Sequence, residues 1–280
     1  MLRLIEGSIA SIEHDLVLVA PPDAKLGDGL HNVTVDAFHH QQLIRDMQRL
    51  RGRIYLDEGN VTREQLTADG RHQTAEDEKG WHLLMTDGHG RVRSCALYML
   101  YENAASIADL RVRHCPLVQH PEWKTKVRGA VESEIARARR AGLRFAELGG
   151  WAIAKERRGT PEGLMMALGT YGLARMLGGA LGITTANVAH SCSSILRRLG
   201  GSFLEFDGTT IPSYFDPRYN TTIDLLRFDS RCPNTKYANL IDIVKEKLAN
   251  VTVIANRFDV ALESENDTTI GLATRPMFAA

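Results

Sequence analysis

The chain has 280 residues, a hydrophobic content of 44% and a formal net charge of zero. This composition allows a substantial core and carries no global signature of nucleic-acid binding, and no apolar run approaches the roughly 20 residues of a membrane span. The four cysteines lack metal-ligand spacing and the N-terminus lacks a signal-peptide pattern. We therefore expect reduced thiols, no bound metal, no nucleic-acid partner, no stable membrane insertion and a cytoplasmic location.

The first part of the chain predicts strands around one long helix. Residues 9–19 favour an N-terminal strand or hairpin, and a turn-rich connection over 21–29 leads to a helical pattern over 35–56. Strands over 81–85 and 92–100 flank a short turn with two glycines, which is typical of a β-hairpin.

A helix predicted over 123–141 precedes a strand that contains Gly149-Gly150 in its interior. Period-two alternation places five residues on one face of this strand: Phe145, Glu147, Gly149, Trp151 and Ile153. Consecutive glycines often mark a bulge, which splays a strand from its neighbour and leaves backbone N–H and C=O groups unpaired. A pantetheine arm carries two amides that suit such groups. A plain bend without any ligand is the alternative.

The next segment predicts an anion site at the start of a helix. Thr160 is a good N-cap and Pro161 suits the first helical position, so Arg157, Arg158 and Gly159 come just before free N–H groups. Arginine adds bidentate phosphate contacts. The alternative is a pair of solvated arginines on a surface loop.

A second strand and helix follow. We predict a strand over 183–188 and a short helix capped by Ser191 and terminated by Gly200-Gly201. Two strands with a helix between them imply a right-handed crossover between neighbouring strands, and ligands in such layouts lie where the strand ends open.

The rest of the chain predicts further strands, one helix and a tail. The strands are expected over 203–206, 209–214, 222–228 and, as an edge strand, 251–255, with a helix over 236–248. We expect a single domain over residues 1–255, in which 1–30 form an N-terminal strand extension. Residues 256–280 are polar and weakly patterned, which predicts a tail or arm.

This order of strand, double glycine, arginine loop, capped helix and second strand resembles the GNAT N-acyltransferase superfamily. The resemblance implies an α/β (α+β) fold with a central mixed, mostly antiparallel twisted sheet, a splayed strand pair and flanking helices. Pro161 departs from the superfamily's phosphate loop because it removes one N–H donor. The positions that the resemblance assigns to the thioester donor are Trp151, Ile153, Ala154, Arg157, Arg158, Gly159, Thr160, Gly163, Asn187, His190 and Ser193.

A narrower resemblance covers roughly residues 50–240. Segments at 53–58, 69–84, 211–217 and 225–229 look like the N-acyl amino acid synthases, which are related to the acyl-homoserine-lactone synthases. That likeness implies a fatty acyl thioester as donor. Three residues are predicted to contact the substrates, namely Arg71, His72 and Met165, although the first two also suit a plain surface loop and Met165 an ordinary core.

N-acyl transfer needs a neutral amine, a polarised thioester carbonyl and a protonated leaving thiolate. Glu147, upstream of the glycines, is the candidate base, with a structural glutamate as the alternative. Tyr214 is the candidate proton donor to sulfur and His82 another candidate base, while a core tyrosine and a hydrogen-bonded structural histidine are their alternatives. We expect the oxyanion donor to be a backbone N–H near 151–153.

Charge is uneven along the chain, because basic residues outnumber acidic ones between Lys124 and Arg158. A basic face there suits the phosphates of coenzyme A or an acidic acyl carrier protein, and equally a solvated helix face. We therefore expect transfer of a fatty acyl group from acyl-CoA or an acyl carrier protein thioester to a small amine such as an amino acid. The alternatives are a non-catalytic acyl-CoA-binding sensor or scaffold and a short-chain acetyltransferase.

Overall fold

The computed structural model describes residues 15–101 and 106–256. A mixed, mostly antiparallel sheet runs in the order β10-β11-β6-β5-β4-β3-β1-β12-β2, with β7 paired to β11, and β8 and β9 form a separate ribbon. The strands are β1 Leu16–Val19, β2 Val33–Val35, β3 Trp81–Thr86, β4 Val92–Tyr101, β5 Arg144–Ile153, β6 Ala180–Asn187, β7 Ser202–Phe203, β8 Glu205–Phe206, β9 Thr209–Thr210, β10 Tyr214–Asp216, β11 Thr221–Asp229 and β12 Thr252–Ala255. The fold class expected from the sequence is confirmed.

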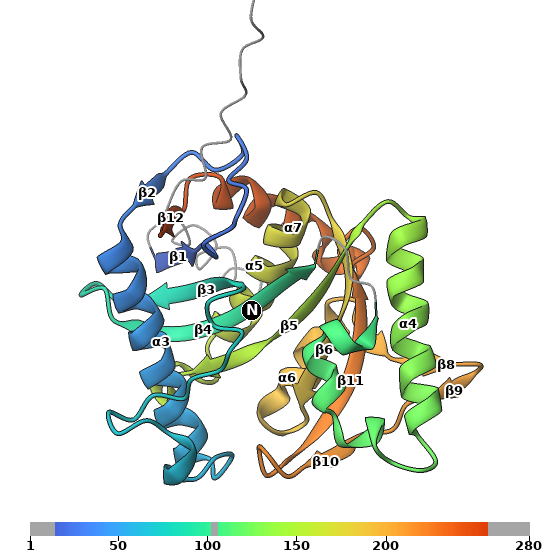
Figure 1. Cartoon of the computed structure of the whole chain (residues 1–280). Coiled ribbons are helices and arrows are strands. Elements are labelled where there is room, and N and C mark those ends of the chain that lie inside the picture. Colours follow the sequence, from blue (N-terminus) through green and yellow to red (C-terminus); the bar gives the residue numbers. More distant parts are fainter. Residues whose placement is uncertain (1–14, 102–105, 257–280) are drawn as a thin grey trace, which may run out of the picture.

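Helices cover both faces of the sheet (Figure 1). They are α3 Ala37–Asp57, α4 Lys124–Arg140, α5 Glu162–Met176, α6 Cys192–Arg198 and α7 Thr235–Leu248. α3 and α4 pack on two halves of one face, over separate apolar clusters, and α5, α6 and α7 share the cluster on the other face. Asp36 caps α3 by accepting from the backbone N–H of His39 at 2.9 Å, and Asn234 caps α7 in the same way. In the described part of the chain, none of these helices has the length and apolarity of a membrane span.

Several predicted elements need correction. The strand predicted over 203–206 splits into β7 and β8, and that over 209–214 splits into β9 and β10, because β7 and β10 pair with β11 whereas β8 and β9 pair with each other. β12 is not an edge strand, since it pairs with β1 on one side and β2 on the other. Ser191 sits before α6 with a left-handed backbone, φ 62°, and its side chain makes no cap hydrogen bond. Residues 257–280 of the C-terminal tail predicted over 256–280, and residues 9–14 of the first predicted strand, lie outside the described residues.

The feature that positions the site is the divergence of β5 from β6. Their parallel pairing runs from Arg144 opposite Ala180 to Leu148 opposite Thr184 and stops there. Beyond that point β5 still pairs with β4, and β6 still pairs with β11. Each strand therefore keeps its outer partner and loses its inner one, which leaves backbone groups facing a gap. The splayed strand pair expected from the sequence is present.

A bulge at the glycines accompanies this divergence. Gly149 lies opposite Leu97 and Ala152 opposite Cys95, so β5 carries one extra residue there, and Gly150 has a φ of 61° that favours glycine. Because side chains alternate between the two faces of a sheet, the extra residue exchanges the faces to which the following side chains of β5 point. Trp151 and Ile153 consequently lie on the α5 side, opposite to Phe145 and Glu147, and the prediction that all five alternate residues share one face is wrong.

The paired end of β5 and β6 requires a glycine. A Cβ built on Gly182 would overlap the carbonyl oxygen of Ala146 and press on the ring of Phe228. We predict that Gly182→Ala lowers the free energy of unfolding by roughly 1–3 kcal/mol, the usual cost of overpacking. Urea denaturation measures this change. Gly88→Ala is the matched control, since nothing lies within 4 Å of its Cβ position, and equal stability of the two variants would contradict the prediction.

Candidate functional site

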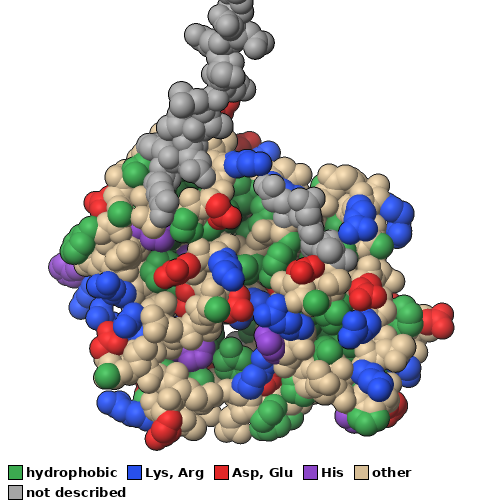
Figure 2. Space-filling model, viewed as in Figure 1, with side chains coloured by type: hydrophobic (Ala, Val, Ile, Leu, Met, Phe, Trp, Pro, Cys, Tyr) green, Lys and Arg blue, Asp and Glu red, His purple; other side chains and the backbone are tan. Residues whose placement is uncertain are grey.

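A cavity of about 490 Å³ lies at the point where β5 and β6 diverge. The bulged part of β5, from Leu148 to Ile153, forms one wall, and Thr184, Thr185 and Asn187 of β6 form part of another. On the face shown in Figure 2, basic and histidine side chains gather around a hollow in the middle of the molecule. Because residues from both faces of the sheet line the cavity, it passes through the gap between the two strands.

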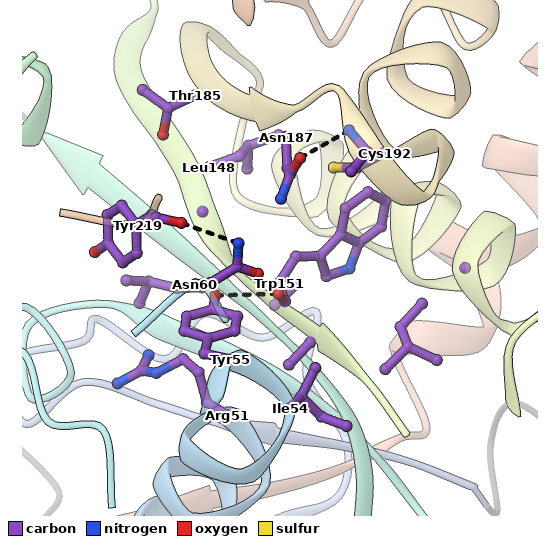
Figure 3. Close-up of a pocket in the computed structure, with 18 of the residues that line it drawn as sticks. Arg51, Ile54, Tyr55, Asn60, Leu148, Trp151, Thr185, Asn187, Cys192 and Tyr219 are labelled. Carbon is purple, nitrogen blue, oxygen red and sulfur yellow. Dashed lines mark hydrogen bonds between the residues drawn. The ribbon is translucent and has the colours of Figure 1, made fainter. Parts of the chain in front are cut away.

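The end of the cavity on the α3 side is aromatic and polar. The rings of Tyr55 and His72 meet edge-on with centroids 5.3 Å apart, and Tyr219 lies 6.1 Å from each. Asn60 donates from Nδ2 to the carbonyl oxygen of Tyr219 at 2.9 Å, and Tyr55 donates its hydroxyl to the carbonyl oxygen of Trp151 at 3.1 Å (Figure 3). These bonds join the end of α3 to β5 and to the turn before β11.

A buried ion pair supports this end. Arg51 donates from Nη2 to Asp77 Oδ2 and to the carbonyl oxygen of His72, both at 2.6 Å, and the side chains of Arg51 and Asp77 are 2% and 1% exposed. Asp77 also accepts from Gln48 Nε2 and the backbone N–H of Thr74. Burial alone would raise the pKa of Asp77, but the charge and hydrogen bond of Arg51, together with the Thr74 N–H, lower it to about 2. The pair therefore stays ionised and fixes residues 72–77 against α3.

His72 lines this end with an unsatisfied nitrogen. Its Nδ1 is buried and has no hydrogen-bond partner among the described residues. Burial, followed by the positive charges of Arg51 and Arg111, lowers the pKa of His72 to about 4. The ring is therefore neutral at pH 7.

The end on the α5 side is more apolar. Trp151 and Ile153 from β5, Gly163 from α5 and Cys192 and Ile195 from α6 line it. Trp151 Nε1 is buried without a partner in the described structure. Figure 3 shows the Trp151 ring between α5 and the start of α6.

The arginine loop forms the rim of this end and is less positive than its sequence suggests. Arg157 donates from Nε to the buried Glu162 at 2.8 Å, and Arg158 pairs with Glu58 at the end of α3. Both arginines line the cavity, but each already has a carboxylate partner. The helix α5 begins at Glu162 with Pro161 at the N-cap position and no side-chain cap bond, one residue later than predicted, so Thr160 is not the N-cap. The Thr160 hydroxyl still accepts from the backbone N–H of Glu162 at 3.3 Å.

The three candidate catalytic side chains lie outside the cavity. Glu147 is buried and accepts from the Tyr101 hydroxyl and from the backbone N–H groups of Arg111 and Val112, at 2.7, 2.6 and 2.9 Å. Tyr214 is a core residue of the α4 cluster. His82 is buried in β3 and donates from Nε2 to the carbonyl oxygen of Asp77 at 2.6 Å. This geometry favours the structural alternative for all three.

Four other predicted contacts also lie away from the cavity. Ala154 and Met165 belong to the core, and the Ser193 hydroxyl donates to Asp224 at 2.5 Å. Arg71 pairs with Asp69 on the surface. The side chain of His190 is outside the described structure.

The cavity does bring together most of the predicted donor positions with one predicted substrate residue. These are Trp151, Ile153, Arg157, Arg158, Gly159, Thr160, Gly163, Asn187 and His72. Their roles stay predictions. Sequence reasoning missed five polar residues of the α3 side, which are Arg51, Tyr55, Asn60, Arg111 and Tyr219. Only tertiary contacts between distant segments bring these together, and no local pattern marks them.

Comparison with solved structures decides the fold. The CoA-dependent acyl-homoserine lactone synthase BjaI, solved with SAM and isopentyl-CoA, has a TM-score of 0.53 at 13% identity, over 88% of this chain and 95% of BjaI. BjaI with MTA gives a TM-score of 0.54, again at 13% identity, over 88% and 96%. The chain has a GNAT-like fold. This confirms the fold that the sequence resemblance implied.

A more distant match is FeeM, an N-acyl amino acid synthase from uncultured soil microbes. Its TM-score is 0.43 at 12% identity, over 69% of this chain and 92% of FeeM. No family model matches the chain, and no curated protein matches its sequence.

The buried histidine of β3 predicts a pH dependence of stability. Burial lowers the pKa of His82 to about 4, whereas an unfolded histidine titrates near 6.5. Between these values the unfolded state binds more protons, so stability is lost as the pH falls from 6.5 to 4. His82→Gln keeps a donor for Asp77 and should remove up to about 3 kcal/mol of this loss. Urea denaturation at pH 7 and 4.5 measures it. His39→Gln, on an exposed site, is the control, and an unchanged pH slope in His82→Gln would refute the assignment.

Proposed function

We propose that this protein is an N-acyltransferase that moves an acyl group from a thioester to a small amine such as an amino acid. The observation that carries the proposal is the cavity through the gap between β5 and β6. Its walls combine unpaired strand edges, an apolar end and an arginine rim. An extended thioester donor needs these three environments for its amides, its acyl chain and its phosphates.

In this proposal the pantetheine arm lies between the strands and pairs with their free backbone groups. The donor phosphates lie at the loop from Arg157 to Thr160, just before α5 begins. The thioester then lies beside the bulge at Gly149 and Gly150. The amine approaches from the α3 side, where Tyr55, His72 and Tyr219 surround it.

The reaction forms a C–N bond and breaks the thioester C–S bond. A neutral amine attacks the carbonyl carbon and a backbone N–H of the bulge stabilises the oxyanion. The nitrogen then loses one proton, and the released thiolate takes up one proton to leave as the thiol. Glu147 is not assigned the role of base, because its oxygens are occupied by three donors. We assign the polar contact with the amine to neutral His72.

We further propose a fatty acyl donor. Apolar side chains from α3, β4, β5 and α6 line the cavity, namely Ile54, Leu97, Leu148, Ile153, Ile195 and Leu196. The methionines of α5 that the sequence suggested for an acyl channel do not line it, because they face the core between the sheet and α7. The apolar wall therefore comes from other elements.

The experiment is transfer by the purified full-length chain, with acyl-CoA donors from acetyl to palmitoyl and a mixture of amino acids. Each methylene buried adds about 0.8 kcal/mol, so kcat/KM should rise about fourfold per methylene before it levels off. Thiol release gives the rate and mass spectrometry identifies the N-acyl product. Preference for acetyl-CoA over every longer donor would refute the fatty acyl assignment. Tight acyl-CoA binding without product would indicate a binding module instead.

A second prediction concerns the arginine rim. The double variant Arg157→Ala, Arg158→Ala should weaken coenzyme A binding roughly fivefold to thirtyfold, equivalent to about 1–2 kcal/mol, since phosphate contacts replace existing ion pairs. Calorimetric titration measures the affinity. Lys155→Ala is the matched control. This exposed lysine belongs to the same loop as the two arginines, pairs with Asp57 at the end of α3 and does not line the cavity. Equal affinity of the double variant and the control would place the phosphates elsewhere.

A further inference from the structure

The most specific feature that the proposed function leaves unexplained is Arg111. It begins the short 3-10 helix Arg111–His114, which follows β4 and lies beside the bulge of β5. Its side chain lines the cavity on the same side as Tyr55 and His72. Val112 anchors the segment in the apolar cluster under α4, but the position of the Arg111 backbone has a second cause.

Glu147 supplies that cause. One carboxylate oxygen accepts from the backbone N–H of Arg111 at 2.6 Å, and the other accepts from the N–H of Val112 at 2.9 Å. The Tyr101 hydroxyl donates to the same carboxylate at 2.7 Å. Charge-assisted bonds of this kind are strong when buried, and Glu147 is only 4% exposed. Glu147 is therefore a positioning residue for the backbone of Arg111.

Gly149 determines where the guanidinium lies. A Cβ on Gly149 would overlap Nη1 of Arg111, so the guanidinium rests directly on the strand at the bulge. Any larger residue there would displace it. The absence of a side chain at Gly149 thus places a positive charge beside the proposed thioester position.

That charge has no anionic partner among the described residues. The other charged residues of the cavity wall are paired, Arg51 with Asp77, Arg157 with Glu162, and Arg158 with Glu58. The described structure gives Arg111 no ion pair and its guanidinium no hydrogen bond. The neighbouring ring of His72 is neutral at pH 7 and offers Nδ1 as a second unsatisfied polar group.

We propose that Arg111 binds the carboxylate of the acceptor, so that the acceptor is an α-amino acid rather than a simple amine. The inference rests on the proposed acyl transfer. In an α-amino acid, a single carbon joins the carboxylate to the amine. A carboxylate held over Gly149 therefore keeps the amine close to the bulge, where the proposal places the thioester carbonyl. The planar guanidinium suits a bidentate carboxylate contact, and no described carboxylate competes for it.

The experiment compares each amino acid that the enzyme accepts with its α-carboxamide, which keeps the amine and the side chain but has no negative charge. Wild-type full-length protein should use the amino acid at least tenfold better in kcat/KM. Arg111→Gln should lower kcat/KM for the amino acid roughly 10- to 100-fold, mainly through KM, and leave the carboxamide almost unchanged. Arg111→Lys keeps the positive charge but loses the planar guanidinium that makes two parallel hydrogen bonds. Its kcat/KM for the amino acid should lie between those of the wild type and Arg111→Gln.

Two further variants separate positioning from folding. Glu147→Gln keeps one acceptor oxygen and replaces the other by an NH₂ group, which repels the one backbone N–H, of Arg111 or of Val112, that it faces. The variant should therefore lower the ratio of kcat/KM for the amino acid to kcat/KM for the carboxamide without changing coenzyme A affinity. Arg128→Gln, exposed on α4, controls for the loss of one positive charge and should leave the ratio unchanged.

The outcomes distinguish this inference from the proposed function. Equal use of amino acids and carboxamides by the wild type, or an unchanged ratio in Arg111→Gln, would overturn the carboxylate site while acyl transfer stands. Absence of both transfer and acyl-CoA binding would overturn the proposed function and this inference with it.

Discussion

The divergence of β5 from β6 after Leu148 is the constraint on which the rest of the site depends. A parallel pair that continued to its ends would fill the centre of the sheet with backbone hydrogen bonds and leave no passage between the two faces. The extra residue at Gly149-Gly150 prevents this by bending β5 while its ladder with β4 continues. The molecule thereby gains a cavity in its most rigid layer, which fixes the geometry of whatever binds there.

Two buried carboxylates then attach irregular segments to this layer. Asp77 ties residues 72–77 to Arg51 of α3, and Glu147 ties the segment after β4 to β5. Neither carboxylate lines the cavity, yet each fixes a segment that does. Buried ionised groups are costly unless fully paired, and both are satisfied by several donors. Polar groups in the interior of this protein therefore serve to place its loops.

The sequence predicted the elements whose signal is local. The helix over 35–56 and the hairpin around residues 81–100 follow from periodicity and turn residues, and the bulge follows from the double glycine. The predictions that were wrong concern features that depend on pairing between distant segments. β12 becomes an internal strand only because β2 pairs with it, and the facing of Trp151 reverses because of one extra residue. Glu147 shows what sequence could not predict at the site. The sequence around a carboxylate beside a bulge is the same whether the carboxylate contacts a substrate or two backbone N–H groups.

The pairing of Arg157 with Glu162 and of Arg158 with Glu58 has a consequence for turnover in the proposed reaction. A donor phosphate has to displace these carboxylates, so binding exchanges one anion for another instead of filling an unopposed positive site. The displaced carboxylates remain close by and compete for the arginines throughout the cycle. In the proposed reaction we expect this competition to limit how tightly the spent donor is held and to speed its release, a step that sets the rate of many enzymes.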